Sequence, residues 1–218
     1  MVITEATRDL KQLNPLVKTM LEIALNKIIK KGIKPLVTET YRPQERQYYL
    51  YGQGRSFSQC IGAGMPKKYA NKYARGGDQV TWTLNSMHTK RCAVDLIPQR
   101  DGKAIWNSKD AETLKIIEIM QSVGFEAGAN WEYSPDSPHF QVAGVKVKGK
   151  TFKKSNTNKF VTKMIQRQLK KAGFYKDYVV DGIWGKATDT AVKKWKKSKG
   201  WKVNKKIGCV ALKALLSY

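Results

Sequence analysis

The sequence predicts an α+β protein in which a small antiparallel sheet flanked by helices is followed by a three-helix bundle. Two observations support this fold class. In residues 1–148, segments with apolar residues at helical spacing alternate with short apolar runs typical of strands. Residues 158–218 contain three short segments of helical spacing joined by glycine-containing turns. We therefore expect two domains, joined by a polar, basic linker at residues 149–157.

The first domain should open with a helix, because Asn14 and Pro15 are residue types that favour the first positions of a helix. Residues 56–80 have several glycines and no sustained period, so they are expected to form a long loop of the functional or mobile kind. The other expected elements are strands within 35–40, 92–98, 100–106 and 139–147, a helix within 42–54, and a helix capped by Ser108.

Cysteine usage and hydropathy exclude several classes of protein. The three cysteines are far apart and form no Cys-x-x-Cys pair, which excludes a cysteine zinc finger and argues against a disulfide framework. The start of the chain lacks the apolar core of a signal peptide, and no apolar run approaches membrane-spanning length. We therefore expect a monomeric protein made in the cytoplasm, with no membrane insertion, which reaches the outside by a route other than a signal peptide.

The charge indicates an anionic partner. The net charge is +24, which favours binding to nucleic acid, anionic lipid or an anionic cell-wall polymer. It is unevenly distributed, at +9 for residues 1–150 and +15 for residues 151–218. This asymmetry is a second indication that the two parts have different tasks.

Only two histidines occur in the chain, and both have carboxylates nearby. His88 precedes Asp95 by seven residues, and Asp136 precedes His139 by three. Two imidazoles and one carboxylate are a common catalytic zinc set, and a further carboxylate, Asp136 or Glu132, can act as base. On one regular strand, residues seven apart face opposite sides, so the set converges only if residues 89–92 form a turn or bulge. The spacing alone is weak evidence, because His-Asp pairs of this kind also arise by chance. Cys92, between apolar neighbours, is expected to be a buried structural thiol rather than a ligand.

Three motifs resemble those of the VanY-like zinc peptidases, which include D-alanyl-D-alanine carboxypeptidases and the L-alanyl-D-glutamate endopeptidases of bacteriophage endolysins. They are "TYRPQERQYYLYGQGR", "SMHTKRCAVDL" and "WEYSPDSPHFQV", in the family's order across residues 37–142. The chain departs from the family at Arg91, where many members have glycine. By this resemblance the site residues are His88, Asp95 and His139 as Zn²⁺ ligands, Asp136 as base, Arg42 at the oxyanion or a substrate carboxylate, and Ser86 behind the ligands.

The resemblance implies an enzyme that hydrolyses a peptide bond of the bacterial cell wall. An aspartate as base resembles the endopeptidase branch, so the expected target is the L-alanyl-D-glutamate bond of the stem peptide. The rival activity is that of a D-alanyl-D-alanine carboxypeptidase. A hypothesis of another class is a non-catalytic basic protein that binds cell wall or nucleic acid, which the charge alone permits.

Residues 158–218 resemble the three-helix peptidoglycan-binding domain of many wall hydrolases, through marks such as "DGIWG" and "GFY". We therefore expect peptidoglycan and anionic wall polymers as partners rather than specific nucleic acid. An endolysin of this kind acts on the wall once the host membrane is permeabilised. The candidate wall-binding residues are Trp184, Trp195, Lys193, Lys194, Lys196 and Lys197. The two tryptophans also suit a role in the core of the bundle, and a lysine-rich helix often has only a solvated face.

Overall fold

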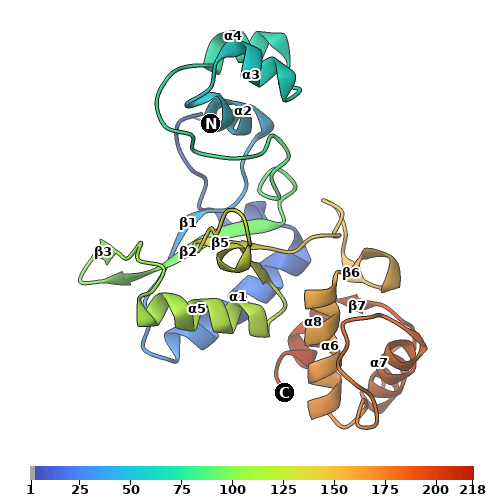
Figure 1. Ribbon diagram of the computed structural model, residues 1–218. Coiled ribbons are helices and arrows are strands. Elements are labelled where there is room, and N and C mark those ends of the chain that lie inside the picture. The colour runs from blue at the N-terminus through green and yellow to red at the C-terminus, as the bar shows by residue number, and fades with distance from the viewer. Residues whose placement is uncertain (1–2) are drawn as a thin grey trace.

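The computed structural model describes residues 3–218 and confirms the α+β class (Figure 1). The first part contains η1 (Leu10–Gln12), α1 (Pro15–Ile29), β1 (Pro35–Glu39), α2 (Gln44–Gly52), α3 (Phe57–Gly62), α4 (Lys67–Tyr73), β2 (Ala93–Arg100), β3 (Lys103–Ala104), α5 (Ala111–Ser122), β4 (Glu126–Ala127), η2 (Gly128–Asn130) and β5 (His139–Gln141). The second part contains β6 (Thr151–Phe152), η3 (Lys154–Asn156), α6 (Lys159–Lys171), α7 (Lys186–Ser198), β7 (Ile207–Gly208) and α8 (Cys209–Leu215). Among these residues no helix is both long and apolar enough to cross a bilayer.

The sheet is antiparallel, with the order β1-β2-β5-β4, and β3 forms a hairpin with β2. In its register Asp95 of β2 lies opposite Glu39 of β1 on one side and His139 of β5 on the other. Residues directly opposite each other in an antiparallel pair present their side chains on the same face. One row of polar side chains therefore crosses three strands on this face.

The opposite face of the sheet forms the core. Val94 and Leu96 alternate with Asp95 along β2 and are buried with Met20 of α1 and Met120 of α5. The predicted start of α1 is confirmed, because the Asn14 side chain accepts a hydrogen bond from the backbone N–H of Leu16. Apolar packing on one face leaves the polar row free to line a cleft on the other.

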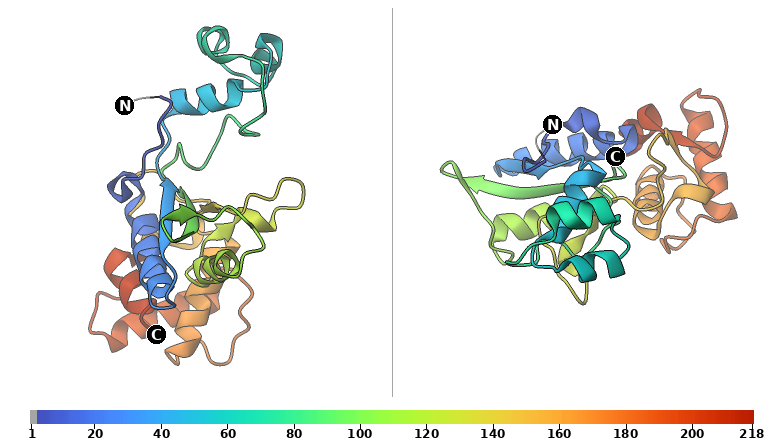
Figure 2. Two further views of the ribbon diagram at one scale, coloured as in Figure 1. Left: turned by 90° about the vertical axis from the view of Figure 1, so that its left-hand side faces the viewer. Right: turned by 90° about the horizontal axis from the view of Figure 1, so that it is seen from above.

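The expected long loop at residues 56–80 is wrong, because this segment contains α3 and α4. Together with α2 they form a protrusion above the sheet (Figures 1 and 2). It has a small core of its own around Cys60, Met65 and Ala70. Helices of six and seven residues are too short to display a sustained period. The missed signal was local, since Ser56 and Gln59 form a capping box at the start of α3.

Two smaller expectations also need correction. α5 is capped by Asp110 rather than Ser108, because the Asp110 carboxylate accepts a hydrogen bond from the Glu112 N–H at 2.9 Å. The last strand, β5, ends at Gln141 instead of extending to residue 147. The chain turns away at Gly144, whose φ of 88° lies in the left-handed region.

The segment expected to be a linker is ordered and partly buried. β6 pairs with β7 of the second part, and Phe152 is fully buried. The two parts also share one apolar core, in which Met20 and Met164 meet at Gly124, whose φ is +103°. The side chain of Asn14 donates hydrogen bonds to three carbonyls between residues 146 and 149. The second part is thus packed against the first, with α8 beside α1 (Figure 1).

Candidate metal centre

His88 reaches the polar row from a tight turn that immediately precedes β2. Residues 87–91 are in turns, and the backbone N–H groups of Arg91 and Cys92 donate hydrogen bonds to the carbonyls of His88 and Met87. Arg91 adopts a φ of 62°, which reverses the chain before the strand begins. The turn required by the odd spacing of His88 and Asp95 is therefore present.

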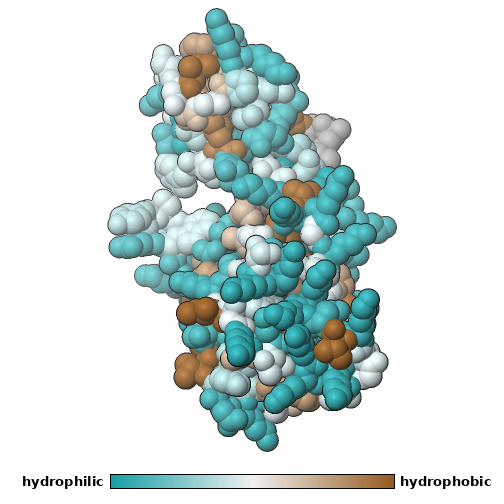
Figure 3. Space-filling model, turned by 90° about the vertical axis from the view of Figure 1, so that its right-hand side faces the viewer, coloured by the Kyte–Doolittle hydropathy of each residue, from teal (hydrophilic) through white to brown (hydrophobic). Residues whose placement is uncertain are grey.

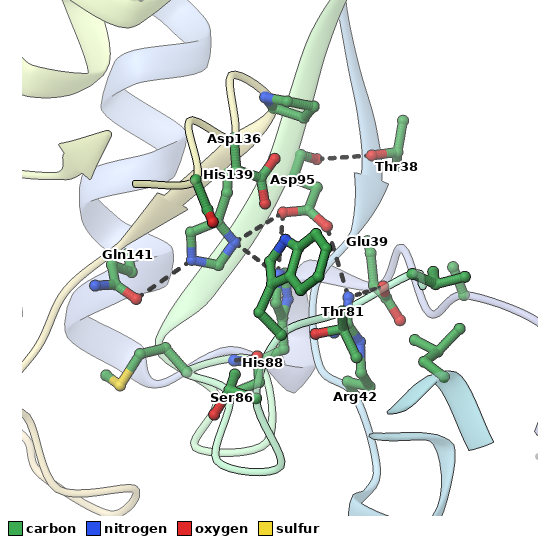
Figure 4. A pocket seen from close by; sticks show the side chains of 18 of the residues that line it. Thr38, Glu39, Arg42, Thr81, Ser86, His88, Asp95, Asp136, His139 and Gln141 are labelled. Atoms are coloured by element: carbon green, nitrogen blue, oxygen red, sulfur yellow. Dashed lines mark hydrogen bonds and ion pairs between the residues drawn. The ribbon is translucent and has the colours of Figure 1, made fainter. Parts of the chain in front are cut away.

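Three side-chain atoms converge at the row (Figure 4). His88 Nε2 lies 3.0 Å from Asp95 Oδ1 and 3.2 Å from His139 Nδ1, and His139 Nδ1 lies 3.1 Å from Asp95 Oδ1. Tetrahedral zinc with bonds of about 2.0–2.1 Å holds its ligand atoms about 3.3 Å apart. The triangle is thus close in size to one face of a zinc coordination shell.

The hydrogen bonds behind the two histidines determine which nitrogen carries the proton. His88 Nδ1 is 2.6 Å from the Thr40 carbonyl oxygen, which can only accept, so Nδ1 donates and Nε2 presents a lone pair. His139 Nε2 is 3.3 Å from Gln141 Oε1, which leaves Nδ1 with the lone pair. Gln141 is oriented in turn, because its amide nitrogen donates to Glu126 Oε2 at 3.1 Å.

Three electron-rich atoms at about 3 Å are mutually repulsive when each presents a lone pair or a negative charge. A cation bound by all three removes this repulsion, which is why the donor set fits a divalent metal with nitrogen and oxygen ligands. Burial raises the pKa of Asp95, but the charge and hydrogen bonds of the His88 and His139 rings in their protonated form lower it by more, so the net pKa lies far below the usual range. The carboxylate is therefore ionised, as a ligand must be.

Asp136 lies beside the triangle on the loop that leads into β5 (Figure 4). Its backbone N–H donates to the Gly128 carbonyl at 3.0 Å, and its own carbonyl accepts from the His139 N–H at 3.2 Å. A side chain at Gly128 would meet the Asp136 carbonyl oxygen at 2.6 Å, so this approach requires glycine. Desolvation and then the charge of Asp95 raise the pKa of Asp136, although nearby cationic groups oppose this. Glu132, the other candidate base, does not line the cleft.

Arg42 is held on the other side of Asp95. Its Nη2 donates to Glu39 Oε2 at 2.5 Å and lies 3.8 Å from Asp95 Oδ2, and its Nη1 donates to Gln47 Oε1 at 2.8 Å. Burial raises the pKa of Glu39, but hydrogen bonds from Arg42 and Arg46 lower it by more. The guanidinium is therefore fixed by an ionised partner and borders the cleft.

The remaining predicted residues of the first part also lie at the turn. Ser86 Oγ accepts a hydrogen bond from the His88 N–H at 3.2 Å, and Ser86 lines the cleft beside His88. Cys92 is fully buried, and burial raises the pKa of its thiol to about 11, as expected for a structural cysteine. Arg91 stacks over the Tyr41 ring at 3.9 Å and donates to Gln12, away from the cleft. Its positive φ explains why a glycine also suits this position.

Two residues that orient His139, Gln141 and Glu126, were not predicted from the sequence. Gln141 lies two residues along β5 and so faces the same side, which the period of a strand could have revealed. Glu126, whose other carboxylate oxygen accepts from Trp131 Nε1 at 3.2 Å, is brought opposite Gln141 only by the pairing of β4 with β5. The two paired residues are 15 positions apart with irregular chain between them, and β4 has only two residues.

In the second part, three of the expected wall-binding residues are buried. Trp184 and Trp195 are 4% and 0% exposed and belong to the core. Lys196 is buried too, because its Nζ donates to Asn204 Oδ1 at 2.8 Å. The exposed lysines of α7 are Lys186, Lys193, Lys194 and Lys197. Figure 3 shows this side of the molecule as largely hydrophilic, with isolated apolar residues.

The polar row of Glu39, Asp95 and His139 and the neighbouring His88 line a cleft of about 560 Å³. Two histidines and one aspartate that leave a position for water, with a further carboxylate nearby, are the arrangement of a metallopeptidase.

Comparisons with known proteins agree with this class. Residues 79–142 match the family described as D-alanyl-D-alanine carboxypeptidase, and residues 162–215 match the family described as putative peptidoglycan binding domain. The chain is 30% identical over 138 residues to peptidoglycan L-alanyl-D-glutamate endopeptidase CwlK of Bacillus subtilis (strain 168), which covers 60% of this chain and 73% of CwlK. The chain therefore belongs to this family of VanY-like peptidases.

Two solved structures are also similar. One is the L-Ala D-Glu endopeptidase ChiX of Serratia marcescens, with 20% identity, a TM-score of 0.41, and coverage of 64% of this chain and 86% of ChiX. The other is the LdcB LD-carboxypeptidase, with 17% identity, a TM-score of 0.42, and coverage of 59% of this chain and 58% of LdcB.

Proposed function

We propose that this protein is a zinc-dependent endopeptidase that hydrolyses the L-alanyl-D-glutamate bond of peptidoglycan stem peptides. The observation that carries the proposal is the convergence of two imidazole lone pairs and an ionised carboxylate in an open cleft. His88 Nε2, Asp95 Oδ1 and His139 Nδ1 would hold the ion. The choice of bond is supported by the relative CwlK, whose name states that activity.

Zinc bound at this site supplies Lewis acidity, which makes a water molecule more acidic and a peptide carbonyl more electrophilic. Asp136 accepts the proton of the attacking water and returns it to the amine of the leaving fragment. Its raised pKa suits this exchange, because a carboxylate that is too weak a base would not take the proton. Gly128 and the His139 N–H fix the backbone of Asp136, so its side chain stays beside the triangle.

Arg42 contributes positive charge where the carbonyl oxygen becomes negative or where a substrate carboxylate binds. The γ-linked D-glutamate has a free α-carboxylate, which is a suitable partner for a guanidinium. Glu39 and Gln47 fix the position of Arg42, so little ordering is needed when the substrate arrives.

A second candidate activity is that of a D-alanyl-D-alanine carboxypeptidase, which the description of the matched family favours. The two activities release different products from purified peptidoglycan. The endopeptidase leaves L-alanine on the glycan and gives peptides that begin with D-glutamate, whereas the carboxypeptidase releases free D-alanine. Mass spectrometry of the soluble products distinguishes them. Asp136→Ala protein and protein treated with a chelator serve as inactive controls, and restored activity on adding Zn²⁺ identifies the metal.

For the second part, residues 158–218, we propose binding to peptidoglycan and its anionic polymers, supported by the family match at 162–215 and by the net charge of +15 over residues 151–218. Lys193, Lys194 and Lys197 are the exposed members of the predicted set. Together the two activities would suit an endolysin that acts after the host membrane is permeabilised. The test is lysis of membrane-permeabilised cells by purified protein, compared with cells whose membrane is intact.

A further inference from the structure

Two exposed tryptophans border the cleft that contains the metal centre. Trp82 is 66% exposed and Trp106 is 62% exposed, although tryptophan usually buries most of its surface. They come from separate segments, the loop between α4 and β2 and the segment after β3, yet both line the same cleft as His88 and His139. Because neither ring is buried in the core of the fold, their position requires another explanation.

Several polar groups lie beside Trp82 in the cleft. Thr81, Thr83 and Asn85 line the cleft next to Trp82, and Arg55 lies over its ring at 5.9 Å. An apolar ring face bordered by hydroxyl and amide groups is suited to a pyranose, whose axial C–H groups form an apolar face while its hydroxyl and acetamido groups lie at the edge. A peptide side chain has no comparable edge of hydroxyl groups.

The chemistry of the proposed substrate places a sugar at this distance. In peptidoglycan the amino group of L-alanine is joined to the lactyl group of muramic acid, so one residue and one lactyl unit separate the sugar from the scissile carbonyl. An extended residue spans roughly 3.3–3.6 Å, so the sugar lies about 7 Å from that carbonyl. For a terminal D-alanyl-D-alanine bond the separation would be about five units, or roughly 17 Å. A sugar within the same cleft is therefore a consequence of cutting at L-alanine.

We propose that Trp82 and Trp106 form a saccharide subsite that holds the muramoyl sugar attached to the scissile L-alanine. This inference rests on the proposed L-alanyl-D-glutamate activity. The cleft of about 560 Å³ falls within the range of sites that enclose ligands larger than a single amino acid. The two rings would make the enzyme prefer stem peptides that are still joined to the glycan over free peptides.

The test compares two soluble substrates that differ only in the acyl group on L-alanine. These are N-acetylmuramoyl-L-alanyl-D-glutamate and N-acetyl-L-alanyl-D-glutamate, both without a charged amino group at L-alanine. We expect the wild type to have the higher kcat/KM on the first. Trp82→Ala and Trp106→Ala should each lower kcat/KM on the muramoyl substrate by about two- to tenfold, mainly through KM, and leave the acetyl substrate unchanged. Trp→Phe variants should restore part of the preference.

Tyr133→Ala is the matched control, because Tyr133 is 91% exposed and does not line the cleft. A second readout is the indole N–H signals in an NMR spectrum of Asp136→Ala protein. Those of Trp82 and Trp106 should shift with the muramoyl dipeptide and not with the acetyl dipeptide.

Cleavage of both dipeptides with equal efficiency by the wild type, or an unchanged preference in both alanine variants, would overturn the subsite and leave the proposed function standing. If the wild type cleaves neither dipeptide but releases D-alanine from a pentapeptide, the proposed function is wrong and the subsite is wrong with it.

Discussion

The two parts of the molecule use tryptophan in opposite ways. In the first part, Trp82 and Trp106 expose about two thirds of their surface beside the cleft. In the second part, Trp184 and Trp195 are buried, and the Trp195 ring packs edge-on against Trp201 with centroids 5.5 Å apart. The surface of α7 is formed instead by lysines such as Lys193 and Lys194.

This difference separates two modes of recognition. The cleft presents fixed, directional groups, namely the ligand triangle, Asp136 and the exposed rings, which suit one particular segment of a substrate. The second part presents flexible positive charges, which act over a distance on any dense array of negative charge. Residue type alone did not indicate which mode applied, since a tryptophan in a binding site and a tryptophan in a core look the same in the sequence.

The largest expected effect concerns the chemistry of the cleft. Asp136→Asn should lower kcat by about 10²–10⁴-fold, because the base is lost, while zinc remains bound to three unchanged ligands. Steady-state kinetics and metal analysis of the same preparation test this. Glu132→Gln is the control, and it should retain its activity because Glu132 lies outside the cleft. A strong loss in Glu132→Gln with none in Asp136→Asn would reverse the assignment of the base.

The contrast between the buried Trp195 and the exposed Trp106 can be tested by measuring the stability of their alanine variants. Trp195→Ala should lower the free energy of unfolding by about 3–5 kcal/mol, because a fully buried ring leaves a cavity. Trp106→Ala should change it by no more than about 0.5 kcal/mol, because the ring is largely in solvent. Urea denaturation of the two variants measures both values. Equal losses would mean that Trp106 has a structural role and would weaken the contrast.

Salt dependence distinguishes the two modes of binding. Sedimentation of inactive Asp136→Ala protein with purified walls should weaken by about tenfold or more between 0.1 M and 1 M salt, since the screening length falls from about 10 to 3 Å. Replacing Lys193, Lys194 and Lys197 with glutamine should reduce this dependence. Lys196→Gln is the control, because its Nζ is bonded to Asn204 within the fold. Wall binding that stays constant at 1 M salt would assign recognition to groups other than the lysines.

The smallest effect is expected at the turn that presents His88. Arg91→Gly should change the free energy of unfolding by no more than about 1 kcal/mol, because the relief of a left-handed backbone offsets the lost contact with Tyr41. Arg91→Ala should be the less stable of the two, since it loses the contact and keeps the unfavourable φ. Thermal melts of both variants measure this order. A glycine variant that melts below the alanine variant would show that the contacts of Arg91 dominate over its conformation.

Much of the fold and the centre of the site could be predicted from local patterns. The apolar spacing after Asn14 marked α1, and the run around Asp95 marked β2. The assignment of His88 and His139 as candidate ligands depended on the family motifs, because no local pattern indicates that a turn will place a residue beside a strand. α3 and α4 were missed because their apolar residues pack on one another within a small separate core. The pairing of β6 with β7 joins segments more than fifty residues apart, so composition suggested a free linker where the chain is part of a sheet.

The apolar contact between Met20, Gly124 and Met164 also limits how far the enzyme can search. A catalytic domain on a flexible linker samples a volume whose radius grows with the length of the linker. Here the cleft stays at one distance and orientation from the surface of α7. If the second part binds the wall as proposed, the enzyme would reach only the stem peptides at that fixed offset and would have to dissociate before cutting elsewhere. In that case its rate on an intact wall would depend on release from the wall, and tighter wall binding would make the enzyme slower.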